Sequence, residues 1–242
     1  MRLIILLFCL STLTNCDANN IITDINSNST NINNDTTSIT SDSIKHYLAL
    51  GDSYTIAQSV ASNRSFPAQL RDCLIETPKI DLELEIIAAT GWTTGDLIAA
   101  IEKGPKRATY NLVTLLIGVN NQYQGKPFTV YKREFTDLLE QSIKLANNNK
   151  NNVVVVSIPD YAYTPFGQNS NPKKISKEID KYNTYAEATA NTFGVTFVNI
   201  TDITREGLKD PELVANDNLH PSGKAYKKFA EKICPTASSI LK

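Results

Sequence analysis

Residues 47–54, Tyr-Leu-Ala-Leu-Gly-Asp-Ser-Tyr, join an apolar run to a glycine and two polar side chains. The apolar half is typical of a buried strand, and Ser53 comes just after its end. Further apolar runs of this kind occur at residues 82–89, 112–117, 153–158 and 195–200. Near-continuous runs rich in Val and Ile favour parallel strands that are covered on both faces. Residues 47–54 therefore predict the first strand of a parallel sheet and the turn that leaves it.

Amphipathic stretches fill the intervals between these apolar runs. Near residues 66–74, 135–143, 175–193 and 226–233, apolar side chains recur at the spacing of one helix face. Strands that alternate with helices imply right-handed crossovers between parallel strands. The pattern predicts an α/β fold over residues 44–242, a three-layer α/β/α sandwich with a central, mainly parallel five-stranded sheet. Ligands of such open sheets bind beyond the carboxyl ends of the strands.

The chain ahead of this domain resembles an export signal. Residues 1–15 contain a short apolar run, too short to span a bilayer and typical of a secretory signal peptide. Leu-Thr-Asn-Cys at residues 13–16 resembles the lipobox of bacterial lipoproteins, in which Cys16 would receive lipid; the alternative is an ordinary signal with a chance cysteine. Residues 16–43, rich in Asn, Ser and Thr, predict a flexible tether or simply a disordered terminus. We expect an exported protein, either a bacterial cell-envelope lipoprotein (outer surface or periplasm) or a secreted one.

Composition narrows the classes of partner. A chain of 242 residues with 41% hydrophobic content is long enough for one domain with a real core. Its 24 basic and 25 acidic residues give a net charge of −1, which offers no footprint for a nucleic acid. The chain has only two histidines and no cysteine pair at ligand spacing, so we expect no metal site. We also expect no organic cofactor. Cys73 and Cys234, in predicted helices at the two ends of the domain, form either a disulfide or two small buried hydrophobic positions.

Three side chains supply the groups that acyl transfer to a serine requires. A serine hydroxyl is a weak nucleophile at neutral pH, so Ser53 needs a base within hydrogen-bond reach. His46 lies at the opposite end of the first predicted strand, which leaves His220 as the base. A carboxylate must hold the imidazole in the correct tautomer, and Asp217 is placed to do so from the same turn. Ser53, Asp217 and His220 are the predicted catalytic residues.

These residues belong to blocks that occur in order along the chain: Gly-Asp-Ser at 51–53, Thr-Gly-Trp-Thr at 90–93, Gly-Val-Asn-Asn at 118–121 and Asp-Asn-Leu-His at 217–220. The blocks follow predicted strands or precede the last predicted helix. In these blocks the chain resembles the SGNH, or GDSL-type, hydrolase superfamily of esterases and lipases, with its flavodoxin-like sandwich. The resemblance covers roughly residues 44–233.

The resemblance also implies an oxyanion hole. Its donors would be the backbone amides of Ser53 and Gly91 and the side-chain amide of Asn120, which stabilise the negative oxygen of a tetrahedral intermediate. Asn121 stands where the family often has aspartate, and we expect this change to affect only fine positioning.

Aromatic residues near the carboxyl ends of the predicted strands are candidates for the substrate pocket. A loop over residues 159–172 follows the fourth predicted strand, and loops of this length usually serve a site. Tyr161, Tyr163 and Phe166 of this loop, with Tyr54 beside the nucleophile, are the candidates. A packed surface loop is the alternative.

The sequence therefore predicts a serine esterase that acts on a small-molecule ester, a lipid or an acylated glycan through an acyl-enzyme on Ser53. The resembling family includes lysophospholipid, short-chain ester and O-acetylated sugar substrates, among which the sequence does not choose. A lipid anchor would bring the protein to a membrane. Two alternatives stay open, an acyltransferase of the same fold and a catalytically silent surface binding module.

Overall fold

The computed structural model describes residues 44–76 and 81–242. All of them belong to one unit of the chain, Ile39–Lys242. The predicted signal peptide at residues 1–15, the lipidation candidate Cys16 and the predicted tether at residues 16–43 lie outside the described residues, so these assignments remain predictions.

The apolar runs form the central sheet, because their side chains can be buried on both of its faces. Its strands are β1 (Ile44–Gly51), β2 (Asp81–Ala88), β3 (Leu112–Leu116), β4 (Val153–Val156) and β5 (Thr196–Val198). They pair in parallel in the order β2-β1-β3-β4-β5. Every residue of β3 and β4 is buried. The prediction of a parallel five-stranded sheet is confirmed.

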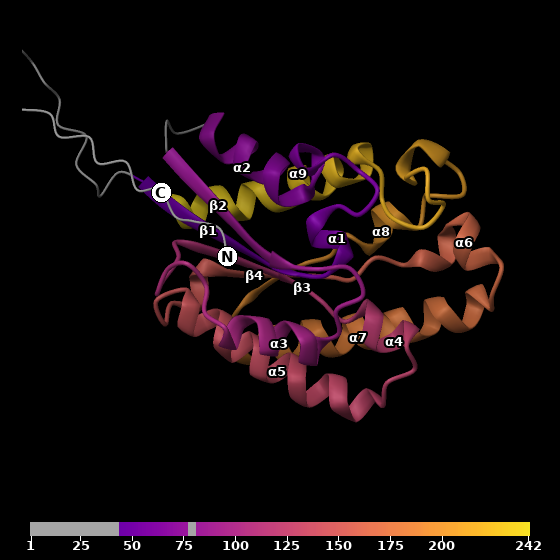
Figure 1. Cartoon of the computed structure of the whole chain (residues 1–242), viewed down its shortest axis with the longest axis horizontal. Helices are drawn as coiled ribbons and strands as arrows, with labels where there is room; N and C mark the ends of the chain where they lie inside the picture. Colours follow the sequence, from indigo (N-terminus) through magenta and orange to yellow (C-terminus); the bar gives the residue numbers. More distant parts are fainter. Residues whose placement is uncertain (1–43, 77–80) are drawn as a thin grey trace, which may run out of the picture. The chain divides into compact units, whose positions relative to one another are not determined.

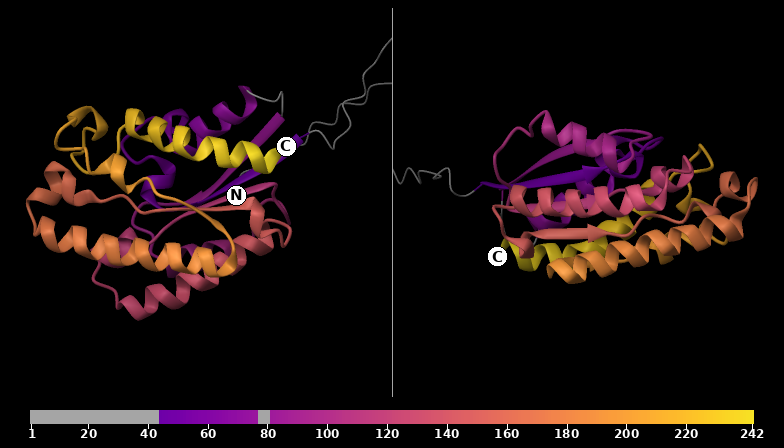
Figure 2. Two further views of the ribbon diagram at one scale, coloured as in Figure 1. Left: turned by 180° about the vertical axis from the view of Figure 1, so that it is seen from behind. Right: turned by 90° about the horizontal axis from the view of Figure 1, so that it is seen from below.

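Helices cover both faces of this sheet (Figures 1 and 2). One layer holds α1 (Ser53–Ile56), α2 (Phe66–Glu76), α8 (Thr201–Thr204) and α9 (Gly223–Leu241). The other holds α3 (Thr94–Glu102), α4 (Val119–Tyr123), α5 (Phe128–Leu145) and α7 (Pro172–Phe193). The predicted three-layer sandwich is therefore confirmed. Among the described helices, none is both long and apolar enough to cross a bilayer.

The fifth strand is shorter than predicted, and its neighbourhood explains why. The backbone amides of Ile200 and Thr201 donate to the hydroxyl of Ser157, at 2.8 and 3.2 Å. These donors are directed to a side chain instead of to a neighbouring strand, so β5 ends at Val198 and α8 begins at Thr201. Asn199 Oδ1 also accepts from the amide of Thr201, at 2.9 Å, and this polar residue within the predicted run was a usable sign that the strand ends early.

Two of the helices in the first layer are covalently joined. Cys73 of α2 and Cys234 of α9 form a disulfide across 161 residues of sequence. Of the two interpretations that the sequence left open, the structure has the bridge. A cross-link over such a long loop restricts the unfolded chain and typically stabilises a domain by about 2–4 kcal/mol.

The loop predicted over residues 159–172 contains more regular structure than expected. It forms a 3₁₀ turn, η4 (Tyr161–Tyr163), followed by a short helix, α6 (Pro165–Gln168). Side chains cap both: Asp160 Oδ1 accepts from the amide of Ala162 at 3.1 Å, and Thr164 Oγ1 accepts from the amide of Gly167 at 3.1 Å. These caps hold the aromatic residues of the loop in fixed positions beside the carboxyl end of the sheet.

Candidate active site

The turn after β1 sets the position of Ser53, the first residue of α1. Gly51 is required because a Cβ atom there would lie 2.0 Å from Thr55 Oγ1 and 2.5 Å from the carbonyl oxygen of Leu116. Asp52 caps the helix, since its Oδ1 accepts from the amide of Tyr54 at 3.0 Å. Its carboxyl group is fully buried, and this desolvation raises the pKa of Asp52 to about 7. Asp52 therefore shapes the turn and makes no hydrogen bond to the histidine.

Three side chains from the two ends of the domain form a continuous relay. Ser53 Oγ lies 3.0 Å from His220 Nε2, although 167 residues separate them. His220 Nδ1 lies 2.6 Å from Asp217 Oδ2. Both distances are within hydrogen-bond reach, and the order serine–imidazole–carboxylate is that of an activated nucleophile.

Asp217 is held by more hydrogen bonds than the sequence suggested. Its Oδ1 accepts from the amides of Leu219 and His220, both at 2.9 Å. Its Oδ2 accepts from Ser59 Oγ at 2.6 Å as well as facing His220 Nδ1. Partial burial favours the neutral acid, but the bonds from Ser59, from the His220 ring and from the two amides outweigh it and lower the pKa of Asp217 to about 2. The residue is therefore an anion at every pH near neutrality.

His220 is fixed from several sides. Its side chain is largely buried, and the ring of Tyr54 lies 5.3 Å away at 57°. Its carbonyl oxygen accepts from the amide of Ala215 at 2.7 Å, which closes the loop that carries Asp217. Asn218 adopts a left-handed conformation, φ 63°, within that loop. Asn tolerates this region better than most residues, and the turn brings Asp217 back toward the imidazole.

The residues predicted to form the oxyanion hole lie beside Ser53 and His220, at the carboxyl edge of the sheet. Gly91 has φ 81° and its carbonyl accepts from Gln124 Nε2 at 3.0 Å. A Cβ there would meet no atom within 4 Å, so the positive φ rather than space favours glycine. Asn120, in the first turn of α4, donates from Nδ2 to the carbonyl of Trp92 at 3.0 Å. The same amide nitrogen has a second hydrogen available for a ligand.

Asn121 connects α4 to the start of α3. Its Oδ1 accepts from the amide of Thr94 at 2.9 Å, and its Nδ2 donates to Thr94 Oγ1 at 2.7 Å. An aspartate could accept from the amide but could not donate to the hydroxyl. Asn121 is buried and takes no part in the relay, so its contribution is to hold the start of α3 against α4.

A pocket of about 280 Å³ brings these groups together. Its polar side contains Ser53, Gly91, Asn120 and His220. Its remaining wall is mostly aromatic and aliphatic, with Tyr54, Tyr123, Tyr161, Phe166 and Leu219. Three of the four predicted pocket residues are present. Tyr163 is not among the residues that line this pocket: it lines another cavity, and the guanidinium of Arg205 lies 6.0 Å from its ring centroid.

Two residues of this site were missed in the sequence. Ser59 lies 158 residues from Asp217, and nothing in its local pattern indicates that contact. Tyr123 is 58% exposed and follows Asn120 by three residues, within one turn of the same short helix. That spacing was a usable signal, because residues three apart on a helix share a face.

The geometry provides the parts needed for acyl transfer: a nucleophile, a base, an orienting carboxylate and amide donors at one pocket. Across the described residues, no group of three or more His, Cys, Asp and Glu side chains is arranged to hold a metal ion.

Comparisons with known proteins agree with this architecture. The fold is similar to TesA, with 16% identity and a TM-score of 0.65 over 81% of this chain and all of TesA. It is also similar to a variant of Axe2, an acetyl xylan esterase from Geobacillus stearothermophilus, with 19% identity and a TM-score of 0.58 over 80% of this chain and 94% of the other. A third similar structure is the lipase Lip_vut3 from a goat rumen metagenome, with 15% identity and a TM-score of 0.67 over 82% and 100% of the two chains.

Sequence comparisons give two results. No curated protein matches the chain. The model of the GDSL-like Lipase/Acylhydrolase family matches residues 49–228, well over half of the chain, and all four sequence blocks lie inside this match. The chain thus belongs to the GDSL-like Lipase/Acylhydrolase family and is a carboxylic ester hydrolase.

Proposed function

We propose that the protein is an exported serine esterase that hydrolyses short-chain carboxylic esters through an acyl-enzyme on Ser53. The observation that carries this proposal is the unbroken relay from Ser53 through His220 to Asp217, in which Ser53 and His220 line one pocket. Family membership supports ester hydrolysis in general, and the relay supports a mechanism through Ser53.

Acylation begins with attack by Ser53 Oγ on the ester carbonyl carbon. The serine proton moves to His220 Nε2, and the carbonyl oxygen becomes an anion that accepts from the amides of Ser53 and Gly91 and from Asn120 Nδ2. Asp217 holds Nδ1–H and stabilises the imidazolium that forms. Collapse of the intermediate breaks the carbon–oxygen bond of the ester, and the departing alcohol takes the proton from Nε2.

Deacylation repeats these steps with water. His220 Nε2 accepts a proton from the water as its oxygen attacks the acyl carbon. The second tetrahedral intermediate collapses with return of the proton to Ser53 Oγ, and the carboxylic acid leaves. An acceptor alcohol in place of water would give acyl transfer by the same route.

The pocket volume favours a small acyl group. A volume of about 280 Å³ has room for about nine groups of the size of a water molecule, at about 30 Å³ each. The reacting carbonyl and the atoms beside it fill part of that space. We expect acetyl to butyryl esters to be turned over faster than esters of long fatty acids.

Turnover of p-nitrophenyl esters of graded acyl length tests this proposal. We expect activity on the acetate that falls by at least about a thousandfold in Ser53→Ala, because the nucleophile is lost. Ser62→Ala, in the exposed turn Ser62–Arg64, is the matched control and should retain full activity. Equal turnover by Ser53→Ala, or a strong preference for long acyl chains, would contradict the proposal. Product analysis with added sugar or alcohol separates hydrolysis from transfer.

Export and lipid anchoring form a separate part of the proposal, supported by the signal-like residues 1–15 and by Cys16. The full chain, expressed in a bacterium, should enter the detergent phase of a Triton X-114 extract. Cys16→Ser should shift it to the aqueous phase. Equal partition of the two forms would refute the proposal of a lipid anchor. Retention of the full chain in the cytoplasm would refute the proposal of export.

A further inference from the structure

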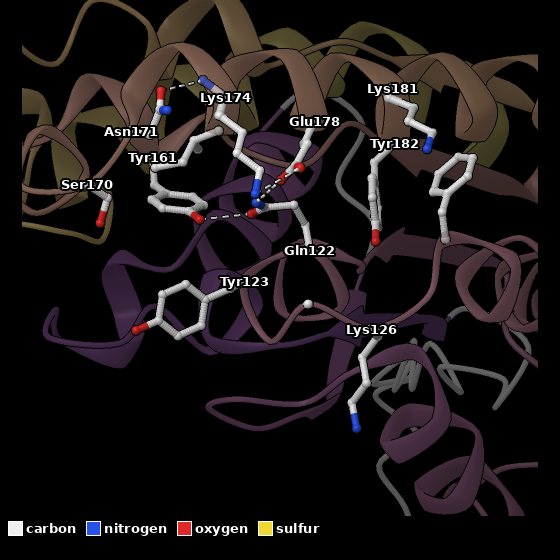
Figure 3. A pocket seen from close by; sticks show the side chains of 13 residues that line it. Gln122, Tyr123, Lys126, Tyr161, Ser170, Asn171, Lys174, Glu178, Lys181 and Tyr182 are labelled. Atoms are coloured by element: carbon white, nitrogen blue, oxygen red, sulfur yellow. Dashed lines mark hydrogen bonds and ion pairs between the residues drawn. The ribbon is translucent and has the colours of Figure 1, made fainter.

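A second cavity adjoins the pocket that contains Ser53. It has a volume of about 560 Å³ and lies between α7 and the segment that runs from α4 to the start of α5; we call it the α7 cavity (Figure 3). Tyr123 and Tyr161 line both it and the pocket of Ser53. A ligand whose ester is held at Ser53 can therefore extend past these two rings into the α7 cavity.

One wall of the α7 cavity is a chain of hydrogen bonds between side chains. Tyr161 Oη donates to Gln122 Oε1 at 2.9 Å, and Gln122 Nε2 donates to Glu178 Oε2 at 2.8 Å. Lys174 Nζ lies 3.8 Å from Glu178 Oε1. Figure 3 shows these groups converging from α4, from the turn Tyr161–Tyr163 and from α7. Because each group is held by its neighbour, the wall presents donors and acceptors in fixed positions to a ligand.

Aromatic rings form the other surfaces of the α7 cavity. Tyr123, 58% exposed, stands at the junction with its ring 6.1 Å from that of Tyr161. Phe128 and Tyr182, with ring centroids 5.0 Å apart, also line the cavity, but Tyr182 is only 4% exposed and Lys181 Nζ lies 4.0 Å from the Phe128 ring centroid. The ring face open to a ligand is therefore that of Tyr123. A flat apolar face beside fixed donors and acceptors matches a sugar ring, which has apolar C–H faces and a rim of hydroxyl groups.

The charges disfavour two other kinds of ligand. Among the described residues that line the α7 cavity, Lys126, Lys174 and Lys181 are cationic and Glu178 is anionic. This balance repels a quaternary ammonium headgroup, and Lys181 Nζ already lies 4.0 Å from the Phe128 ring centroid, on a face that such a cation would need. A fatty acyl chain would desolvate these charged and amide groups without replacing their hydrogen bonds.

We propose that the α7 cavity binds the sugar ring on the alcohol side of an O-acylated carbohydrate, while the pocket of Ser53 receives the acyl group. This inference rests on the proposed esterase activity and adds the class of its substrate. The volume of about 560 Å³ has room for about nineteen groups of the size of water, enough for one sugar ring with part of a second. Glu178 is the main specificity residue, because it accepts hydroxyl hydrogens next to Gln122 and Lys174.

Steady-state kinetics on three acetate esters test the proposal. Acetylated cellobiose supplies the sugar, ethyl acetate supplies the same acyl group without it, and p-nitrophenyl acetate reports the esterase itself. We expect kcat/KM for acetylated cellobiose to exceed that for ethyl acetate by at least about tenfold. Glu178→Gln should lower the first value about tenfold, mainly through KM, and change p-nitrophenyl acetate turnover by less than about twofold.

The matched control is Glu187→Gln, on the same helix at an exposed position that lines neither cavity. This substitution should leave kcat/KM unchanged for all three acetate esters. Equal kcat/KM for acetylated cellobiose and ethyl acetate would overturn the proposal, as would equal losses on all three esters in Glu178→Gln. Faster turnover of lysophosphatidylglycerol, with the same dependence on Glu178, would assign the cavity to a lipid headgroup and also overturn it.

Binding separates failure of this inference from failure of the esterase. Ser53→Ala lacks the nucleophile, so saturation-transfer NMR of acetylated cellobiose with this variant reports binding without hydrolysis. We expect transfer to the sugar protons that decreases in the double variant Ser53→Ala/Glu178→Gln. If Ser53→Ala shows no transfer while the wild type turns over p-nitrophenyl acetate normally, the cavity assignment is refuted and the esterase assignment stands.

Discussion

Replacing Asp217 with asparagine should impair the reaction more than any loss of a single hydrogen bond can explain. Asp217 Oδ1 accepts two backbone amides, from Leu219 and His220, at 2.9 Å each. The asparagine oxygen must stay there, because its NH₂ group in that position would face two donors and lose two bonds, a cost of about 1–3 kcal/mol. The NH₂ group is thereby placed where Oδ2 now lies, 2.6 Å from His220 Nδ1.

This placement changes the tautomer of the neutral imidazole of His220. The NH₂ group donates to Nδ1, so the proton of a neutral imidazole must sit on Nε2, which faces Ser53 Oγ at 3.0 Å. In that tautomer Nε2 cannot accept the serine proton. A comparable substitution in a serine protease lowers kcat by about 10⁴, equivalent to about 5 kcal/mol in activation free energy. We expect a loss of the same order here.

The assay is kcat on p-nitrophenyl acetate at pH 7, with urea unfolding to confirm that the variant is folded. Ser59→Ala provides the comparison, because it removes one donor to Asp217 Oδ2 and leaves the tautomer unchanged. We expect Ser59→Ala to lose no more than about tenfold, near 1 kcal/mol for one hydrogen bond. If Asp217→Asn stays within tenfold of the wild type, the reasoning about the tautomer is wrong.

Other consequences can be measured on the same protein. Asn120→Ala should lower kcat on p-nitrophenyl acetate about a hundredfold, or about 3 kcal/mol, through loss of one oxyanion donor; unchanged kcat would remove Asn120 from the mechanism. Cys73→Ser should lower the free energy of unfolding by about 2–4 kcal/mol, and reductant should lower that of the wild type equally but leave the variant unchanged. Asp52→Asn should change how stability depends on pH. Burial raises the folded-state pKa of Asp52 from 3.8 to about 7, so its contribution to stability is complete below about pH 4 and is lost as pH rises to 7. The free energy of unfolding of Asp52→Asn minus that of the wild type should increase by up to about 4 kcal/mol between pH 4 and 8; a difference that is independent of pH would show that Asp52 is not desolvated.

The sequence was most informative where local chemistry decides the structure. The buried strand before Gly51 and the turn that follows were predictable, because an apolar run ends at a glycine whose missing Cβ the turn requires. Asp217 and His220 were predictable as a pair because their contact lies within one turn. Their meeting with Ser53 followed from a general property of parallel sheets, whose carboxyl ends share one edge.

The remaining features depend on packing between segments that are distant in sequence. Ser59 reaches Asp217 only because the turn that follows α1 meets the loop before α9, and the local sequence of neither segment indicates this partner. Tyr163 was assigned to the pocket from its place among other aromatics, but the turn Tyr161–Tyr163 directs it elsewhere and leaves Tyr161 at the pocket. The α7 cavity depends likewise on how α7 packs beside α4.

The most direct test of the account is the site of acylation. The enzyme is mixed with p-nitrophenyl butyrate, quenched in acid within the first turnover, digested and analysed by mass spectrometry. We predict one butyryl group on the peptide that carries Ser53, absent from His220→Ala. A butyryl group attached with full occupancy to any other residue, in an enzyme that still turns over the ester, would contradict the account.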